Sequence, residues 1–263
     1  MTPPLYLVDE LPAGELTELV GAEGRHAATV RRTRLGERLL VGDGRGGLAT
    51  AEVTAVGRDS LQLRVLERRW VPPPRPTVTL AQALIKGDRG ELAVELATEA
   101  GVDAVLPWRA ARCVARWEDG PRGDKALARW RSTALAATKQ SRRPWLPEVN
   151  EPVSTHTLAA RCAGVSGAGQ ADGCLALVLH EAATTPIAEA LGALAPDAEG
   201  GLDELLLVVG PEGGIADDEL GLLCAAGARA VRLGPQVLRA STAAAVALGA
   251  VGALTGRWNG HSE

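Results

Sequence analysis

Three short segments of the chain contain residues that could contact a bound ligand, and two of them also contain glycine. They are Leu179-His180-Glu181, the GPEGGI run at 210–215 and the LGPQVLR run at 233–239. Each follows a short apolar stretch typical of a buried strand. Ligands of open α/β sheets bind beyond the carboxyl ends of the strands. The three segments are therefore predicted to converge on one pocket.

The run from Gly210 to Gly214 has the composition of a turn that approaches a ligand closely. Glycine reaches backbone angles closed to other residues, and Pro211 restricts the turn. Backbone amides and carbonyls exposed in this way suit the edge of an adenine and a ribose. The run is neither a G-x-G-x-x-G fingerprint nor a P-loop, because no G-K-[ST] sequence follows it. Taken alone, such a turn is more often a structural connection than a ligand site.

The elements that position these segments are apolar strands alternating with helical stretches, the pattern of a parallel sheet covered by helices. Asp217, Asp218 and Glu219 fall in the first turn of one predicted helix, where acidic side chains complement the helix dipole and need no catalytic role. Strands are predicted at 77–85, 103–106, 175–179, 205–209 and 230–233, and helices at 89–100, 122–141 and 242–254.

The first part of the chain has a different pattern. Residues 35–66 contain short alternating strands punctuated by glycine, at 37–41, 48–56 and 60–66, as in a small β-barrel. The segment WVPPPRP at 70–76 ends this pattern, because its four prolines cannot continue a hydrogen-bonded ladder. We therefore predict two domains, residues 1–71 and residues 72–263.

The overall charge does not indicate a nucleic-acid partner, since the formal net charge is −4. Local charge differs: ten Lys or Arg and three acidic residues lie between Pro107 and Trp145. A further cluster comprises Arg31, Arg32, Arg34 and Arg38. Such runs fit either phosphate binding or a solvated helix face, and both interpretations stay open at this point.

The cysteines give no sign of a metal site. The four residues Cys113, Cys162, Cys174 and Cys224 form no C-x-x-C pair, and no histidine lies at metal-ligand spacing, so reduced structural thiols and no metal are expected. No basic region followed by an apolar run opens the chain, and no window approaches the roughly 20 apolar residues that span a bilayer. We expect a cytoplasmic protein without a membrane partner.

The motifs in combination are more specific than any one of them. GPEGG followed by LGPQVLRASTAA (233–244) resembles the closing signature of the bacterial 16S ribosomal RNA uracil-N3 methyltransferases, a branch of the SPOUT superfamily. The segments HAATVRRTRLGE (26–37), KGDRGELAVELATEAGVDAVLP (86–107) and RWRSTALAATKQSRRPWLPEV (129–149) are similar to further family segments. The resemblance implies an enzyme that methylates N3 of a specific uridine in 16S ribosomal RNA of the small ribosomal subunit, using S-adenosylmethionine.

The same resemblance implies an α/β fold with two parts and a homodimer. An N-terminal PUA-like small β-barrel would dock on RNA, and a C-terminal SPOUT-type parallel sheet, tied in a trefoil knot, would carry helices on both faces. S-adenosylmethionine would lie in the knot against the three segments that follow the strands. The residues that this implies for cofactor binding are Leu179, His180, Gly210, Glu212, Gly213, Gly214, Ile215, Leu233, Gly234, Val237, Leu238, Arg239, Ser241 and Thr242.

Arg239 is the candidate catalytic residue. Uracil N3 carries a proton in neutral water, and a preorganised cation would stabilise the anion that forms when this proton leaves. The alternative is that Arg239 caps a carbonyl or pairs with Glu212. Glu212 is interpreted as structural or cofactor-directed, and His180 as either a ligand contact or a satisfied polar group. The residues expected to bind RNA are His26, Arg31, Arg32, Arg34, Lys86, Arg109, Arg112, Gln140 and Arg143.

The chain departs from the family pattern at four positions. Gln236 stands where the family usually has Arg, Ser241 where it has Glu, Ala216 where Ser is frequent, and Arg142 where Gly is common. Proton abstraction by a glutamate at position 241 is therefore excluded. Two other functions stay open: a SPOUT-type RNA ribose 2′-O-methyltransferase, and a catalytically inactive RNA-binding or ribosome-assembly module.

Overall fold

The computed structural model describes residues 2–166, 174–192 and 203–258, and these residues form two compact units. The described residues up to Pro73 form the first unit together with Ala136–Leu146. The second unit comprises Pro74–Leu135 and the described residues from Pro147 onward. The domain division at residues 71 and 72 stays a prediction. Among the described residues, no helix combines the length and the apolar character that crossing a membrane requires.

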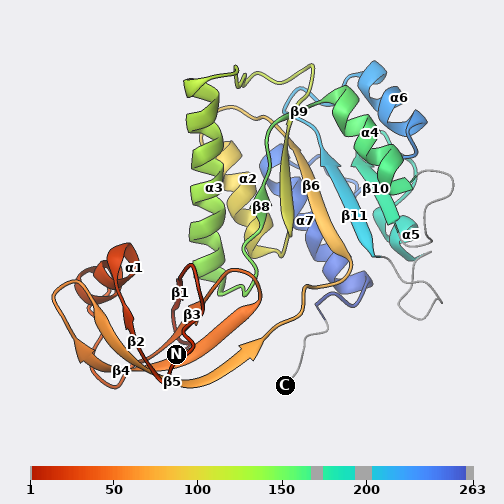
Figure 1. Cartoon of the computed structure of the whole chain (residues 1–263). Coiled ribbons are helices and arrows are strands. Elements are labelled where there is room, and N and C mark those ends of the chain that lie inside the picture. The colour runs from red at the N-terminus through yellow and green to blue at the C-terminus, as the bar shows by residue number, and fades with distance from the viewer. Residues whose placement is uncertain (1, 167–173, 193–202, 259–263) are drawn as a thin grey trace. The chain divides into compact units, whose positions relative to one another are not determined.

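The first unit is built on a five-stranded sheet in the order β1-β3-β4-β5-β2 (Figure 1). β1 pairs in parallel with β3, and the other pairs are antiparallel. Register shifts at Thr50/Ala51 and Val53/Ala55 mark β-bulges, which bend a strand. The result is a curled, mixed half-barrel where the sequence predicted a small barrel. Its strands are β1 (Leu5–Leu7), β2 (Leu16–Leu19), β3 (Arg38–Gly42), β4 (Gly47–Val56) and β5 (Leu61–Trp70).

One helical segment and one distant segment complete the first unit. Helix α1 (Gly21–Arg25) continues directly into a π-helix, η1 (His26–Val30). From the end of α3 (Pro121–Ser141), Lys139 contacts the Glu23 carboxylate at 2.6 and 2.8 Å. Arg142, which stands where the family commonly has Gly, adopts a left-handed φ of 57° just after α3. Its Nε donates to the Pro3 carbonyl at 2.9 Å.

The second unit contains a seven-stranded sheet in the order β12-β10-β11-β6-β7-β8, with β9 also paired to β7. Every pairing is parallel, which confirms the predicted parallel sheet. β8 and β9 were not predicted. The strands are β6 (Thr77–Ala83), β7 (Ala104–Arg109), β8 (Glu148–Val149), β9 (Val153–Ser154), β10 (Cys174–Leu179), β11 (Glu204–Val209) and β12 (Arg229–Val231).

Helices cover both faces of this sheet, as predicted. On one face, Val78 and Leu80 of β6 pack in a core with residues of α2, α3, α5 and α7. On the other face, Ala81 and Ala83 pack with α4 and α6, because successive strand residues point to opposite sides. The trefoil knot stays a prediction. The helices not yet delimited are α2 (Arg89–Glu99), α4 (Thr155–Ser166), α5 (Ile187–Gly192), α6 (Asp217–Ala225) and α7 (Ala240–Leu254).

A buried ion pair ties the start of the sheet to a segment after α7. The side chain of Arg257 is 4% exposed and its Nη2 lies 2.9 and 2.8 Å from the two carboxylate oxygens of Asp103. Arg257 also donates to the carbonyl oxygens of Pro76 and Gly101. Asp103 Oδ2 accepts the Val78 amide at 2.8 Å. These bonds fix the segments that precede β6 and β7.

Candidate active site

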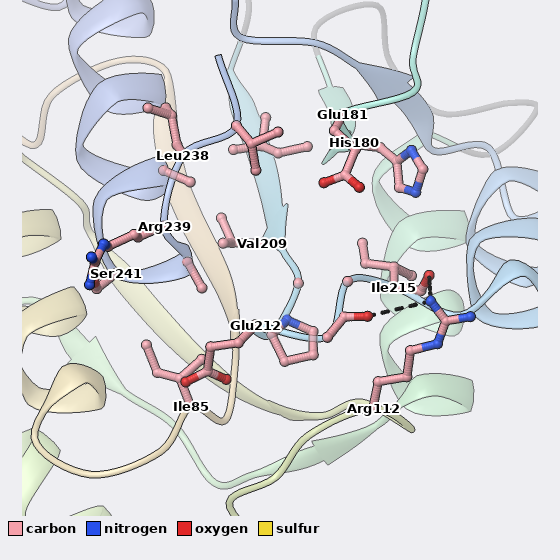
Figure 2. Close-up of a pocket in the computed structure, with 18 of the residues that line it drawn as sticks. Ile85, Arg112, His180, Glu181, Val209, Glu212, Ile215, Leu238, Arg239 and Ser241 are labelled. Atoms are coloured by element: carbon pink, nitrogen blue, oxygen red, sulfur yellow. Dashed lines mark hydrogen bonds between the residues drawn. The ribbon is translucent and has the colours of Figure 1, made fainter.

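The carboxyl ends of β6, β10 and β11 meet at one edge of the parallel sheet, and a cavity of about 830 Å³ opens there (Figure 2). Ile85, just after β6, forms part of its wall. Most of the remaining lining comes from the three predicted segments and the residues directly beside them, at 179–181, 209–215, 237–241 and Ala243, and Arg89, Arg112 and Asp217 complete it. An adjoining hollow of about 90 Å³ is lined by Leu233 and Gly234. The three predicted segments thus lie together in space.

The structure places the predicted cofactor-binding residues in three ways. Those that line the larger cavity are Leu179, His180, Gly210, Glu212, Gly213, Gly214, Ile215, Val237, Leu238, Arg239 and Ser241. Leu233 and Gly234 line the adjoining hollow. Thr242 lines neither, and its backbone N–H donates to the Arg239 carbonyl at 2.9 Å in the first turn of α7. Cofactor contact by these residues stays a prediction.

Packing explains the glycines of the turn after β11. A Cβ atom on Gly210 would lie 2.6 Å from Cγ1 of Ile215, closer than van der Waals contact allows. Gly214 has a φ of +72°, in the left-handed region that favours glycine, and its N–H donates to the Pro211 carbonyl at 3.0 Å. The turn therefore folds back on Ile215, and its glycines are required for that packing.

Side chains and backbone from the segment after β7 hold this turn in place. Nη1 of Arg112 donates to the carbonyl oxygens of Gly213 at 3.4 Å and Ile215 at 3.3 Å (Figure 2). The carboxylate of Glu219, only 6% exposed, accepts the Ala111 amide at 2.9 Å and the Thr155 hydroxyl at 2.6 Å. Glu219 is thus a structural residue, as expected for the first turn of α6. Arg112, which was predicted to bind RNA, lies in the wall of the cavity.

Two charged side chains of the cavity, Glu212 and Arg239, do not pair with each other. Glu212 Oε1 accepts the backbone N–H of Lys86 at 3.1 Å. Arg239 is exposed at the N-cap of α7, and Figure 2 shows its guanidinium on the side of Ser241, pointing away from Glu212. Within the part of the chain that the structure describes, the Arg239 guanidinium makes no hydrogen bond or ion pair. The alternative pairing with Glu212 is therefore not formed in this structure.

His180 has a local partner. Its Nδ1 accepts the Ala182 amide at 3.3 Å, and its own backbone N–H donates to the Val231 carbonyl at 2.9 Å. Because Nδ1 accepts, the ring proton is on Nε2, which is the donor of this side chain without a partner among the described residues. His180 is consequently both fixed by the turn after β10 and able to contact a ligand in the cavity.

Sequence reasoning missed several residues of the cavity wall. Ile85 and Arg89 follow the carboxyl end of β6, Asp217 lies just after the glycine turn, and Glu181 belongs to a predicted segment but was not among the predicted cofactor-binding residues. The signal for Ile85 and Arg89 was present, because the rule that ligands sit beyond strand ends applies equally to the predicted strand at 77–85. The turn after this strand also contains a glycine, Gly87.

The residues predicted to bind RNA belong to both units. In the first unit His26, Arg31, Arg32 and Arg34 are exposed in and after η1, and Gln140 is exposed near the end of α3 whereas Arg143 is half-buried. In the second unit Lys86 is exposed, Arg112 contacts the glycine turn, and Arg109 pairs with Asp119 at 2.8 Å. RNA binding by these nine residues stays a prediction.

The cavity fits a nucleoside-sized ligand. Its volume lies within the roughly 300–1,000 Å³ usual for small-molecule sites. Apolar side chains of Leu179, Ile215 and Leu238 offer surfaces for a purine ring, and the glycine turn brings backbone groups close to it. Carboxylates of Glu181 and Glu212 are available for hydroxyl or ammonium groups. These are the groups that S-adenosylmethionine presents, so the residues fit this cofactor.

Comparison with known proteins also indicates a site for S-adenosylmethionine. Residues 72–252 match the family described as RNA methyltransferase domain, and residues 19–66 match the RNA methyltransferase PUA domain. The half-barrel of the first unit is thus PUA-like. Among solved structures, ribosomal RNA small subunit methyltransferase E from Neisseria gonorrhoeae, bound to S-adenosylmethionine, superposes with a TM-score of 0.79 at 25% identity, covering 97% of this chain and 98% of that one.

Further relatives indicate the same family. A methyltransferase structure from Legionella pneumophila, also in complex with S-adenosylmethionine, has a TM-score of 0.78 at 28% identity and covers 96% of this chain and 98% of its own. The chain is 30% identical over 247 residues to ribosomal RNA small subunit methyltransferase E of Bacillus subtilis, covering 93% of this chain and 91% of the relative. The Mycobacterium tuberculosis protein of that name is 55% identical over 260 residues, 98% of this chain and 95% of its own. With that identity over nearly the full length, the chain belongs to the ribosomal RNA small subunit methyltransferase E family.

Proposed function

We propose that the protein transfers the methyl group of S-adenosylmethionine to N3 of a uridine in 16S ribosomal RNA of the small ribosomal subunit. The name of the relatives supports the small-subunit RNA, and relatives bound to S-adenosylmethionine support the cofactor. The uracil N3 position follows from the signature that GPEGG and LGPQVLR resemble. The observation that carries the proposal is the cavity itself, which is lined both by the glycine turn after β11 and by Arg239. Among the described residues, the guanidinium of Arg239 has no hydrogen-bond or ion-pair partner.

The cofactor would be held by the three segments at the sheet edge. S-adenosylmethionine supplies, when bound, a methyl group on a positively charged sulfur, which is the chemistry that the protein itself lacks. The backbone of residues 210–215 and 233–239 would hydrogen-bond the polar edges of the cofactor. Leu179, Ile215 and Leu238 would pack on its apolar faces. Arg112 and Glu219, which hold the turn after β11, would keep these groups in position before binding.

Arg239 would stabilise the uracil anion. The N3 proton must leave before N3 becomes a good nucleophile, and the negative charge then spreads over the ring oxygens. A guanidinium stays positive at every relevant pH, so Arg239 lowers the free energy of this anion without giving up a proton. The cavity residues from Val237 to Ala243 carry no carboxylate, so Arg239 acts on the charge of the base and not as part of an acid–base pair with a neighbouring residue of this segment. Positioning of the base beside the methyl group supplies the rest of the acceleration.

The RNA would bind, mainly through its phosphates, to residues of both units. His26, Arg31, Arg32 and Arg34 form a basic group on the PUA-like unit, supported by the exposure of all four. The other proposed contacts are Gln140 and Arg143 of the same unit, and Lys86, Arg109 and Arg112 of the second unit. Phosphate contacts release counterions, so substitution of several of these residues should reduce the salt dependence of RNA affinity.

The resemblance also supports an assembly. We propose a homodimer, a trefoil knot in the α/β part, and domains at residues 1–71 and 72–263. Helix α7 exposes Val246 at 44% and Leu254 at 42%, apolar area that a second copy could cover. The proposed substrate places the reaction in the cytoplasm.

The test uses small ribosomal subunits from a strain that lacks the gene. The purified protein and S-adenosylmethionine are added, and the 16S ribosomal RNA is digested and analysed by mass spectrometry. One new N3-methyluridine is expected. A new 2′-O-methylated nucleotide would assign the ribose methyltransferase activity, and cofactor binding without any product would assign the inactive RNA-binding module.

A further inference from the structure

A second cavity, of about 560 Å³, adjoins the proposed active site, and Ile85 lines both. Its walls are the loop of residues 86–88 between β6 and α2, Glu91 of α2, residues 115–117, and the first half of α3. All of these residues belong to the second unit. The backbone N–H of Lys86 donates to Glu212 at 3.1 Å, so the loop of this second cavity is bonded directly to the glycine turn of the first.

One wall of the second cavity is an aromatic ring held by the core. The rings of Trp117 and Trp130 meet edge to face, with centroids 4.8 Å apart and an interplanar angle of 76°. Trp130 is 2% exposed and closely packed, since a Cβ on Gly90 would lie 2.9 Å from its Nε1. Trp117 is half-buried and lines the cavity. A fixed aromatic side chain at a solvent-accessible cavity is a platform for a nucleic-acid base.

The charge of the second cavity favours phosphate. Lys86, Arg116, Arg122 and Arg129 line it against two acidic residues, Asp88 and Glu91. Arg129 is neutralised by Glu91, with 3.1 Å between Nε and Oε1. In the described ranges of the chain, the side-chain cations of Lys86, Arg116 and Arg122 form no ion pair. An aromatic ring beside three available cations is the combination by which proteins bind single-stranded RNA.

We propose that this cavity is a subsite for the nucleotide that neighbours the methylated uridine, with the base stacked on Trp117 and the phosphate held by Arg116 and Arg122. The inference rests on the proposed function, because it deepens the same RNA site. It explains how a single uridine is presented to the first cavity. The neighbouring base leaves the RNA stack and binds in the second cavity, on the other side of Ile85, which lines both cavities.

The first test separates stacking from apolar packing. Trp117→Leu keeps an apolar side chain and removes the ring, whereas Trp117→Phe keeps a ring. Binding of a fluorescent, uridine-containing RNA of about ten nucleotides is measured by anisotropy with S-adenosylhomocysteine at saturation. Trp117→Leu should weaken binding about 10-fold and Trp117→Phe less than about 3-fold. Thermal unfolding confirms that both variants are folded. Equal RNA affinity of the two folded variants would overturn the proposal.

The second test separates this phosphate contact from general charge. Arg116→Ala with Arg122→Ala should lower the slope of log affinity against log salt by about 1.4, since each single-strand phosphate contact contributes about 0.7. Arg161→Ala with Arg229→Ala removes the same charge from exposed positions on α4 and at the start of β12, and should leave the slope unchanged. Equal slopes for the two double variants would contradict the subsite.

Methyl transfer by the unsubstituted protein to small-subunit RNA is measured in parallel. Loss of RNA affinity in Trp117→Leu without any methyl transfer by the unsubstituted protein would support the subsite and count against the proposed function. Methyl transfer together with equal RNA affinity of the two Trp117 variants would support the proposed function and overturn the subsite. The two ideas are therefore judged by different results.

Discussion

Arg112 donates a hydrogen bond to the carbonyl oxygen of Ile215 at 3.3 Å, and it bonds Gly213 at 3.4 Å with the same nitrogen. An arginine that follows β7 thereby holds the turn that follows β11. The local sequence around Arg112 is basic and gives no hint of this contact. Its effect should appear in cofactor affinity as well as in RNA affinity.

Arg112→Ala should weaken binding of S-adenosylmethionine about 5-fold, because two long, partly exposed hydrogen bonds together contribute roughly 1 kcal/mol. Isothermal titration calorimetry without RNA measures this. Arg109→Ala is the matched control, since its guanidinium pairs with the exposed Asp119 and not with the turn. If both variants bind the cofactor like the unsubstituted protein, Arg112 serves RNA alone.

Arg239→Ala should lower the single-turnover rate at saturating RNA by roughly 100- to 1,000-fold, the usual effect of removing one group that stabilises a developing anion. Arg239→Lys keeps the charge and loses the planar guanidinium, so an intermediate rate is expected. Cofactor affinity is measured by calorimetry in parallel, because Arg239 is also a predicted cofactor contact, and the single-turnover rate is taken at saturating cofactor. A near-normal rate for Arg239→Ala would remove the catalytic role.

Gly210→Ala should lower the free energy of unfolding by about 1–3 kcal/mol, because the added Cβ would meet Cγ1 of Ile215 at 2.6 Å. In an Ile215→Ala background the clash is removed, and the same substitution should cost much less. Urea denaturation of the four proteins of this double-mutant cycle measures the coupling. Additive effects would show that Gly210 is needed for a reason other than Ile215.

Arg257→Ala should destabilise the protein by about 3–5 kcal/mol, since it leaves the carboxylate of Asp103 buried without its cation. Arg75→Ala is the control for an exposed pair, because Arg75 and Asp203 are 78% and 56% exposed, and it should cost less than about 1 kcal/mol. Chemical denaturation at low salt compares the two. Similar losses of stability in the two variants would show that burial does not make the Arg257–Asp103 pair more important than an exposed pair.

Alkaline pH should weaken the fold through Cys162. Burial raises the pKa of this thiol from 9.0 to about 11. Below pH 9 the thiol is protonated in both states, whereas between pH 9 and 11 the unfolded chain loses the proton first, so stability falls by about 1–3 kcal/mol. Cys162→Val should fall less steeply over this range. The difference in free energy of unfolding between Cys162→Val and the unsubstituted protein should be constant below pH 9. If this difference also stayed constant above pH 9, the prediction would be contradicted.

The sequence predicted the elements that have a strong local pattern. Apolar strands at 175–179 and 205–209, and the glycine run after Val209, identified the edge of the sheet where the cavity lies. β8 and β9 were missed because two-residue strands carry no periodicity of their own. Their pairing with β7 is decided by residues more than forty positions away in the chain.

The contacts that shape the site were less predictable, because they join distant residues. The Arg112 bonds to Gly213 and Ile215, and the Glu219 bonds to Ala111 and Thr155, arise only once the sheet has formed. The family resemblance supplied what local rules could not, including the cofactor. It did not indicate Trp117, whose position beside the active site depends on the packing of α3.

The order of strands in the parallel sheet has a consequence for synthesis on the ribosome. β6 is made early but pairs on one side with β11, which is made much later, with Thr77 opposite Glu204. A nascent chain that has reached α4 therefore holds β6 and β7 with an open, apolar edge, a species prone to strand-to-strand aggregation. Until β11 is made, this edge of β6 therefore has to be protected from other chains.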